Sequence, residues 1–307
     1  MSRYAVIDIG TNTCNLLIAN STGSGLFEIL YDRKLPVKLG RGGIHKDILL
    51  SDAIDRGLIA LKNHAKIIDQ YKVDTIKIIG TSALRGAQNS DVFCDLVKQS
   101  LGWDIEIISG ELEAELIFRG VDLSLPTDIG TALIVDIGGG SIEFIVADDH
   151  KIHWKKSFNI GIARVLEAIV ISDPIASEQI EEVEKWFTPA LNELSKVCHH
   201  YQIITAVGCS GAFDTFMDIY EQEKPDQKMR KASELPLEEF EKIQKQLIQL
   251  DSLRRGSMVG MEPLRVEMIV IASVFTNFML KKLNIEHLIH TPYSLKEGVM
   301  DQLISEE

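Results

Sequence analysis

The sequence contains few cysteines, and their spacing excludes a fold held together by disulfides. Only four occur in 307 residues, and none forms a CxxC pair. They are Cys14, Cys94, Cys198 and Cys209. A chain of this length can bury a hydrophobic core without a disulfide framework, so a reducing cytoplasm is the expected location. The spacing also excludes the common zinc-binding patterns.

Long apolar runs and an excess of basic residues are also missing. No run approaches the roughly 18 apolar residues that a membrane-spanning helix needs, and Asp8 interrupts the first apolar stretch, unlike in a secretory signal. There are 32 Lys and Arg against 45 Asp and Glu, a formal net charge of −13. Bulk nucleic-acid binding needs a basic face. We therefore expect no membrane and no nucleic-acid partner, and any polyanion must meet a local positive patch.

What the sequence does contain is an alternation of predicted strands and helices, with 45% apolar residues. This alternation is typical of an α/β fold, here with a largely parallel sheet. Residues 123–130 are predicted to form a linker and 220–234 a mobile surface loop. Strands are predicted over 4–19 (two strands and a turn), 25–38, 75–80, 105–108, a second strand–turn–strand from 131, and 285–290. Helices are predicted over 51–71 with Ser51 as N-cap, 91–101, 111–121, 161–171, 177–201, 236–250, 265–283 and 294–304.

An internal repeat is the most informative feature. Residues 5–13 read AVIDIGTNT and residues 133–141 read LIVDIGGGS, an offset of 136 − 8 = 128 residues. Each copy is an apolar strand, then Asp-Ile-Gly, then small or hydroxylated residues before a second apolar strand. Two such units facing one another would form a cleft with one loop from each.

The residues of both loops suit a phosphate group. Glycines let backbone N–H groups approach an anion closely, and hydroxyl and amide side chains add donors. A carboxylate would repel phosphate, so Asp8 and Asp136 are expected to address a metal ion, because Mg²⁺ is usually held by one or two carboxylates, waters and substrate phosphate. For a single copy, an ordinary hairpin turn is the better interpretation, whereas two aligned copies favour phosphate binding. The predicted phosphate-binding residues are Gly10, Thr11, Asn12 and Thr13 (the first loop) and Gly138, Gly139, Gly140 and Ser141 (the second loop).

The two loops resemble those of the exopolyphosphatase/guanosine pentaphosphate phosphohydrolase (Ppx/GppA) family. Residues 81–89 (TSALRGAQN) resemble its TxxLRxAxN segment, and 108–114 (ISGELEA) its ISGxxEA segment. Residues 207–211 resemble its third glycine-rich loop, with Gly208, Ser210 and Gly211, and 265–267 and 294–298 resemble later motifs. The resemblance implies two ribonuclease-H-like domains of the actin-like ATPase superfamily flanking an interdomain cleft. The expected domains are 1–124 with a C-terminal helix at about 294–307, and 125–293.

The resemblance also implies roles for individual residues. Glu113 is expected to be the catalytic base, although a Glu in the first turn of a helix is ordinarily a solvated acid. Arg85 is expected to stabilise phosphate charge, since guanidinium matches phosphate oxygens; otherwise it is a surface arginine. Glu143 lies two residues after Ser141 on a strand, so both should face one side, and it joins Asp8 and Asp136 as a candidate for Mg²⁺ or Mn²⁺.

The implied activity is release of terminal orthophosphate from inorganic polyphosphate. Guanosine pentaphosphate 5′-phosphohydrolysis and a non-catalytic nucleotide-binding regulator are the alternatives. The chain ends without the C-terminal helical domain of longer family members, which favours short polyphosphate. It departs from the family pattern at Leu112, Glu115 and Lys296. The sequence leaves a homodimer open.

Two further sets of residues bear on the substrate. Phe213 is predicted either to stack on a guanine base or to lie in the core. A polyphosphate tail needs only cations, for which the candidates are Arg41, Arg254, Arg255, Arg265 and Lys296.

Overall fold

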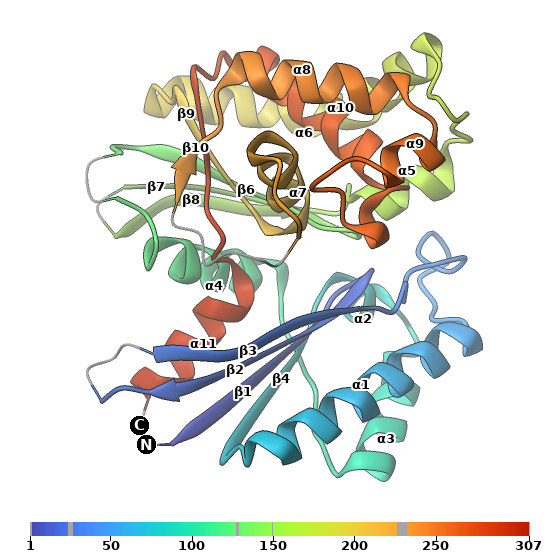
Figure 1. The fold of residues 1–307 in the computed structure, drawn as a ribbon, viewed down its shortest axis with the longest axis vertical. Helices are drawn as coiled ribbons and strands as arrows, with labels where there is room; N and C mark the ends of the chain where they lie inside the picture. Colours follow the sequence, from blue (N-terminus) through green and yellow to red (C-terminus); the bar gives the residue numbers. More distant parts are fainter. Residues whose placement is uncertain (1, 24–26, 127–128, 149, 226–231, 307) are drawn as a thin grey trace.

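Two lobes, each built on one sheet, make up the fold (Figure 1). The computed structural model describes residues 2–23, 27–126, 129–148, 150–225 and 232–306. The first sheet has the order β3-β2-β1-β4-β5. Its strands β1, β2 and β3 are antiparallel, whereas β4 and β5 run parallel to β1. The strands are β1 (Arg3–Ile9), β2 (Thr13–Ser21), β3 (Phe27–Pro36), β4 (Thr75–Gly80) and β5 (Glu106–Ile107).

The second sheet repeats this arrangement. Its order is β10-β11-β9-β6-β7-β8, so β6, β7, β8, β9 and β11 correspond to the five strands of the first sheet, and β10 is an addition. Both sheets are therefore mixed, not largely parallel as predicted, because each copy of the repeat supplies antiparallel strands. The strands are β6 (Ala132–Ile137), β7 (Ile142–Asp148), β8 (Lys151–Phe158), β9 (Thr205–Cys209), β10 (Ser233–Glu234) and β11 (His287–His290).

Helices cover the outer faces of both sheets. The first sheet packs against α1 (Ser51–Tyr71) and α3 (Ser90–Leu101) in one hydrophobic core. The second sheet packs in another core against α5 (Ile162–Ala168), α6 (Ser177–Tyr201), α7 (Ser210–Glu221), α8 (Leu237–Gln249) and α10 (Ile269–Leu283). Three short helices are also present: α2 (Ser82–Gly86), α9 (Ser252–Gly256) and η1 (Pro263–Arg265).

A third core lies between the sheets, around α4 (Gly110–Asp122) and α11 (Leu295–Ser305). These two helices approach so closely that only glycine fits at two contacts. A Cβ at Gly120 would lie 1.9 Å from the carbonyl oxygen of Ser294, and one at Gly298 would lie 1.8 Å from that of Leu116. The last helix thus packs against β1 and β2 as well as α4. The division of the chain into 1–124 with 294–307, and 125–293, stays a prediction.

Most predicted elements appear near their predicted bounds, with several corrections. Leu50 is the N-cap of α1, and Ser51 is its first residue. The predicted helix from residue 265 begins at Ile269, because a 3₁₀ turn precedes it. Strand β8 was not predicted. Within the predicted loop 220–234, α7 continues to Glu221 and residues 233–234 pair with β11, while 226–231 lie outside the described residues.

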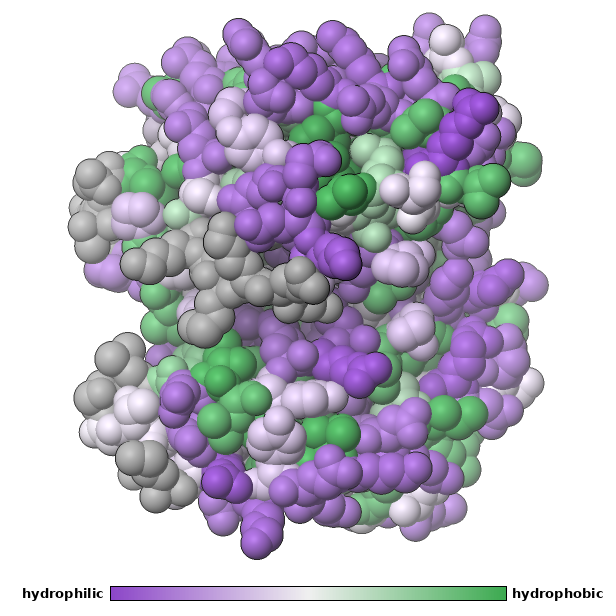
Figure 2. Space-filling view, viewed as in Figure 1, coloured by the Kyte–Doolittle hydropathy of each residue, from purple (hydrophilic) through white to green (hydrophobic). Residues whose placement is uncertain are grey.

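The surface of the molecule is mainly hydrophilic. Figure 2 shows hydrophilic residues over the outer ends of both lobes and apolar residues in scattered groups. In the part of the chain that the structure describes, no helix has both the length and the apolar character needed to cross a bilayer.

Candidate functional site

A cleft of about 850 Å³, its open mouth included, lies between the two lobes. It forms where the strands of both repeat copies end, so it receives the β1–β2 turn from one lobe and the β6–β7 turn from the other. All eight predicted phosphate-binding residues line it. The starts of α4, α7 and α11 complete its walls.

The two loops touch each other, and glycine makes this contact feasible. A Cβ on Gly139 would lie 2.2 Å from Nδ2 of Asn12, and one on Gly140 would lie 2.6 Å from Oγ1 of Thr11 and 2.5 Å from Oγ of Ser82. Side chains larger than hydrogen would therefore force the loops apart. The backbone of the second loop can approach an anion that the first loop also holds.

Asp8 and Asp136 both line the cleft, near the ends of β1 and β6, and are close enough for their charges to repel. Burial raises the pKa of Asp8 to about 6, with a further increase from Asp136 and a decrease from Asn15, whose amide donates to Oδ2 at 2.7 Å. Burial also raises the pKa of Asp136, which accepts a 2.6 Å hydrogen bond from the Ser294 hydroxyl. Two buried carboxylates whose ionised forms are disfavoured suit a cation.

The fit to a divalent cation can be tested on these groups. Oδ1 of Asp8 is buried and has no hydrogen-bond partner among the described residues. No three His, Cys, Asp or Glu side chains of the described ranges converge into a ready-made metal cage. Mg²⁺ needs no such cage, since it takes one or two carboxylates and fills its other positions with water and phosphate oxygens. The residues present therefore fit such an ion.

Glu113 and Glu143 line one end of the cleft, and Arg85, which does not line it, forms a cluster with them through its ion pair to Glu113. Arg85 Nη1 donates to Oε2 of Glu113 at 2.8 Å and to the Ile108 carbonyl at 3.0 Å, whereas Nη2 is buried without a partner among the described residues. Glu113 is only 6% exposed, so it is not the solvated helix-start acid of the alternative interpretation. The hydroxyl of Ser109 caps this helix by accepting from the Leu112 N–H.

The two acids of this cluster hold protons more strongly than usual. Burial raises the pKa of Glu113 well above its usual value, Glu143 raises it further, and Arg85 opposes the rise. Burial and the nearby Asp136 raise the pKa of Glu143 to about 7. The Ser157 hydroxyl donates to Glu143 at 2.6 Å. A carboxyl group that titrates near neutral pH is suited to accept a proton during catalysis.

Glu143 has a counterpart in the first copy of the repeat. Glu143 pairs with Asp136 across β6 and β7, and Asn15 pairs with Asp8 across β1 and β2. The difference 143 − 15 = 128 equals the offset of the repeat. The two halves of the cleft therefore differ in one respect that bears on chemistry, because an amide stands in one half where a carboxylate stands in the other.

The opposite end of the cleft carries ion pairs that the sequence did not reveal. Lys34 Nζ lies 2.9 Å from Oδ2 of Asp214, and Oδ1 of Asp214 lies 3.0 Å from Nε2 of His290. Lys296 lies 2.8 Å from Asp32 and 2.5 Å from Glu297. No local pattern marks Lys34 for this place, since its partner is 180 residues away.

The third glycine-rich segment is not a loop. Gly208 lies within β9, where a Cβ would be 2.1 Å from the ring of Phe213, and it does not line the cleft. Ser210 and Gly211 do line it, as the first residues of α7, and Ser210 has a left-handed φ of 68°. Phe213 is 1% exposed, which confirms its core interpretation.

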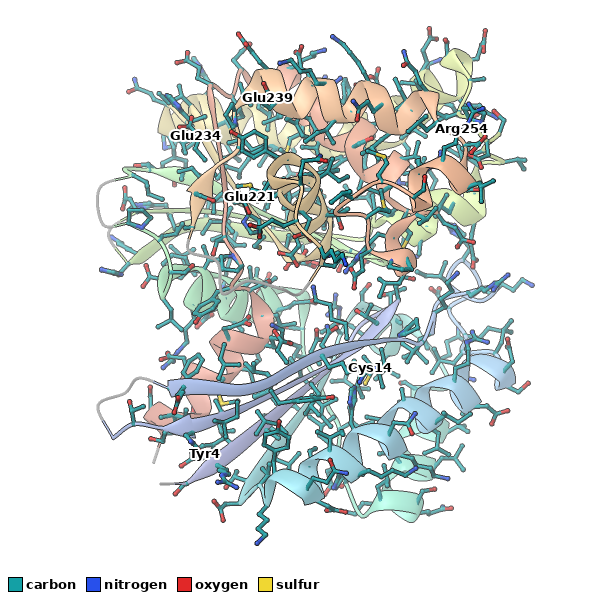
Figure 3. The ribbon with its side chains drawn as sticks, in the orientation of Figure 1. Tyr4, Cys14, Glu221, Glu234, Glu239 and Arg254 are labelled. Carbon is teal, nitrogen blue, oxygen red and sulfur yellow. The ribbon has the colours of Figure 1, made fainter. Side chains whose placement is uncertain are left out.

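The predicted tail-binding cations are only partly in place. Arg265 and Lys296 line the cleft. Arg254 lies at the outer edge of the second lobe (Figure 3), and Arg255 is buried in a structural ion pair with Asp173 at 2.8 Å. Arg41 is exposed and does not line the cleft.

Comparison with known proteins bears directly on this site. Residues 17–307 match the model of the Ppx/GppA phosphatase family. The chain belongs to this family. An exopolyphosphatase from Cytophaga hutchinsonii has the same fold with a TM-score of 0.94 and 36% identity, covering 99% of this chain and 98% of that one. The Ppx/GppA family member from Aquifex aeolicus gives a TM-score of 0.80 and 27% identity over 99% and 98% of the two chains.

Curated relatives of the Ppx/GppA family are longer. A guanosine-5′-triphosphate,3′-diphosphate pyrophosphatase from Pseudoalteromonas translucida is 29% identical over 99% of this chain and 59% of its own length. A bifunctional 3-dehydroquinate synthase/phosphatase from Fusobacterium nucleatum is 34% identical over 72% of this chain and 35% of its own length. The chain thus spans about 59% of the first of these relatives. The fold expected from the resemblance, two ribonuclease-H-like domains of the actin-like ATPase superfamily, is confirmed.

The departures from the Ppx/GppA family pattern have different structural settings. Leu112 packs against the core between the sheets, and Glu115 is exposed and pairs with Lys155 at 2.6 Å, outside the cleft. Lys296 lines the cleft, as an arginine at this position would. Only the last departure therefore touches the site.

Proposed function

We propose that this protein hydrolyses the terminal phosphoanhydride bond of short inorganic polyphosphate and releases orthophosphate. The observation that carries this proposal is the cluster of Glu113, Arg85 and Glu143 at one end of a cleft lined by two glycine-rich loops. Hydrolysis of a phosphoanhydride needs an oriented water, neutralised phosphate charge and in-line geometry. These residues and loops can supply the first two.

Each residue has a distinct part in this reaction. Backbone N–H groups of the two loops bind the terminal phosphate and hold it between the lobes. Nη2 of Arg85 has no partner among the described residues, so it can donate to a phosphate oxygen that reaches Glu113 while Nη1 stays bonded to Glu113. Glu113 accepts a proton from the attacking water, and its raised pKa brings its basicity nearer to neutral pH.

The Ppx/GppA family is generally dependent on divalent metals. In this chain Asp8 and Asp136 would hold Mg²⁺ or Mn²⁺, with Glu143 as the third candidate. A bound cation would neutralise phosphate charge between the lobes. Where no cation is bound, the carboxylates of Asp8 and Asp136 repel the phosphate groups of the substrate, because like charges repel.

Polyphosphate is favoured over guanosine pentaphosphate by the lining of the cleft. None of the described residues that line it is aromatic, and Phe213 is buried in the core, so no aromatic ring of the described lining is available to stack on guanine. The exopolyphosphatase from Cytophaga hutchinsonii is 36% identical to this chain, and the guanosine-5′-triphosphate,3′-diphosphate pyrophosphatase from Pseudoalteromonas translucida is 29% identical. Guanosine pentaphosphate hydrolysis stays the second candidate, because several curated relatives carry the corresponding name.

The four free cysteines suit the reducing cytoplasm that we propose as the location of this protein.

The test is a direct comparison of substrates. We would measure kcat/KM for phosphate release from tripolyphosphate, long-chain polyphosphate and guanosine pentaphosphate in one buffer with Mg²⁺. We expect tripolyphosphate to exceed guanosine pentaphosphate. A value for guanosine pentaphosphate about tenfold higher, equal to about 1.4 kcal/mol of transition-state stabilisation, would reverse the assignment.

A further inference from the structure

Strand register in the first sheet shows which residues lie at the end of the cleft opposite Glu113. Asp8 on β1 pairs with Asn15 on β2, and Asn15 pairs with Lys34 on β3. Adjacent strands lie about 4.8 Å apart, so Lys34 lies about 10 Å from Asp8 toward the β3 edge of the first sheet. The three residues all line the cleft.

The catalytic cluster lies toward the other edge. At the start of α4, a Cβ on Gly110 would be 2.6 Å from the Cβ of Ser157, the residue that donates to Glu143. The first lobe therefore meets the β8 edge of the second lobe near Glu113. Lys34 instead meets Asp214 of α7 and, through it, His290 of β11. The β8 and β11 strands lie on opposite sides of β6 in the second sheet, so the two contacts mark opposite ends of one cleft.

The Lys34–Asp214 pair joins the two lobes across this end. The side chains are 18% and 24% exposed, and both line the cleft. Burial opposes ionisation of both groups, yet each charge favours the other: the pKa of Lys34 is raised and that of Asp214 falls well below its usual value. The lysine charge is thus already neutralised, and a phosphate arriving here must compete with a carboxylate that also repels it.

We propose that the Lys34–Asp214 ion pair is the end wall of the cleft and limits how many phosphate units of a polyphosphate the enzyme can bind. This inference rests on the proposed function, because it concerns the same cleft. It assigns a specificity-determining role to two residues that do not contact the reacting phosphate.

The test measures how the affinity for polyphosphate depends on its chain length, separately from hydrolysis. Asp214→Asn keeps an oxygen that can accept from His290 but removes the carboxylate charge that neutralises Lys34, whereas Lys34→Met removes the lysine charge and leaves Asp214 bonded to His290. The matched control is Glu267→Gln, which breaks another ion pair between the lobes, Lys38–Glu267 at 2.8 Å, that does not line the cleft. Dissociation constants for tripolyphosphate and long-chain polyphosphate would be measured by calorimetry with Mg²⁺, in a Glu113→Gln background that suppresses turnover.

We expect Asp214→Asn to raise the preference for long over short chains about tenfold, the gain from one charge-assisted contact of about 1.4 kcal/mol. Lys34→Met should lower that preference, and Glu267→Gln should leave it unchanged. The end-wall proposal would be overturned if Asp214→Asn left the preference for long over short chains unchanged. It would also be overturned if Glu267→Gln shifted that preference equally. If Asp214→Asn does not fold, a preference that stays unchanged in Lys34→Met overturns it instead. Absence of phosphate release by the wild type from any polyphosphate would refute only the proposed function, since the binding ratios are measured without turnover.

Discussion

Replacing Glu113 by Gln is expected to remove activity without weakening the fold. A general base contributes about 10²–10⁴-fold to a reaction rate, so kcat should fall by about that factor. Gln is nearly isosteric with protonated Glu and can still accept the hydrogen bond from Arg85, which also stays bonded to the Ile108 carbonyl. The substitution thus changes charge while keeping the local packing.

The raised pKa of Glu113 gives the sign of the stability change. A carboxyl group whose pKa is higher in the folded state stabilises that state at low pH and loses the contribution as pH rises through the folded-state pKa. Each unit of increase corresponds to about 1.4 kcal/mol, and 1 kcal/mol moves the Tm of domains of 150–250 residues by roughly 2–4 °C. Glu113→Gln should therefore have a Tm a few degrees above the wild type at pH 8, with a smaller difference at pH 5.

Two assays check this combination. Phosphate release would be measured with Mg²⁺, and Tm would be measured by calorimetry in EDTA, so that metal binding does not contribute. Glu111→Gln is the control, because Glu111 is an exposed acid in the same helical turn and does not line the cleft. Retention of more than about a tenth of the wild-type kcat, well above the loss expected for a general base, would refute the catalytic role. A Tm below that of the wild type at pH 8 would refute the electrostatic argument.

Three other predictions follow from the site. EDTA should abolish phosphate release and Mg²⁺ or Mn²⁺ restore it, and Asp136→Asn should raise the metal concentration for half-maximal activity; activity in thoroughly chelated enzyme would contradict this. Gly161→Ala should lower kcat/KM, because a Cβ there would lie 2.4 Å from the second-loop backbone, whereas the control Gly86→Ala meets its nearest atom at 3.8 Å and should be tolerated. The lobes should close on substrate about the hinges predicted at 123–130, of which 127–128 lie outside the described residues, and before Ser294. X-ray scattering profiles that stay identical with a non-hydrolysable polyphosphate would argue against closure.

Local periodicity was enough to predict the long helices. The predicted bounds 51–71 and 177–201 coincide with α1 and α6, since an amphipathic helix repeats its apolar residues every three to four positions. Strand β9 was interpreted as part of a glycine-rich loop instead. All five of its residues are buried, so it shows no alternation of apolar and polar residues, and residues 207–211 were assigned by their resemblance to the third glycine-rich loop of the family.

The residues of the site likewise fall into those that the sequence could predict and those that it could not. Both loops and their acids could be predicted because the repeat places them at fixed positions along the chain. Lys34 lies in a predicted strand, but its position depends on the register of β3 on β2 and on how α7 of the other lobe meets that edge. Such placement arises from tertiary packing, and no pattern within a short segment encodes it. The role of Glu113 as a base stays a prediction.

The difference between Asn15 and Glu143 has a consequence for where the terminus of a ligand is bound. A linear inorganic polyphosphate has two identical ends, so the molecule itself has no polarity. Reversing such a molecule end to end therefore changes nothing, and what can vary is the end of the cleft at which its terminal phosphate lies. If the two repeat copies were identical, the terminal phosphate would be bound equally well at either end. Because the carboxylate stands on β7 and the amide on β2, the two placements differ in energy. Divergence at one pair of equivalent strand positions thus lets the protein select the end of the cleft that holds the terminus of a symmetric ligand.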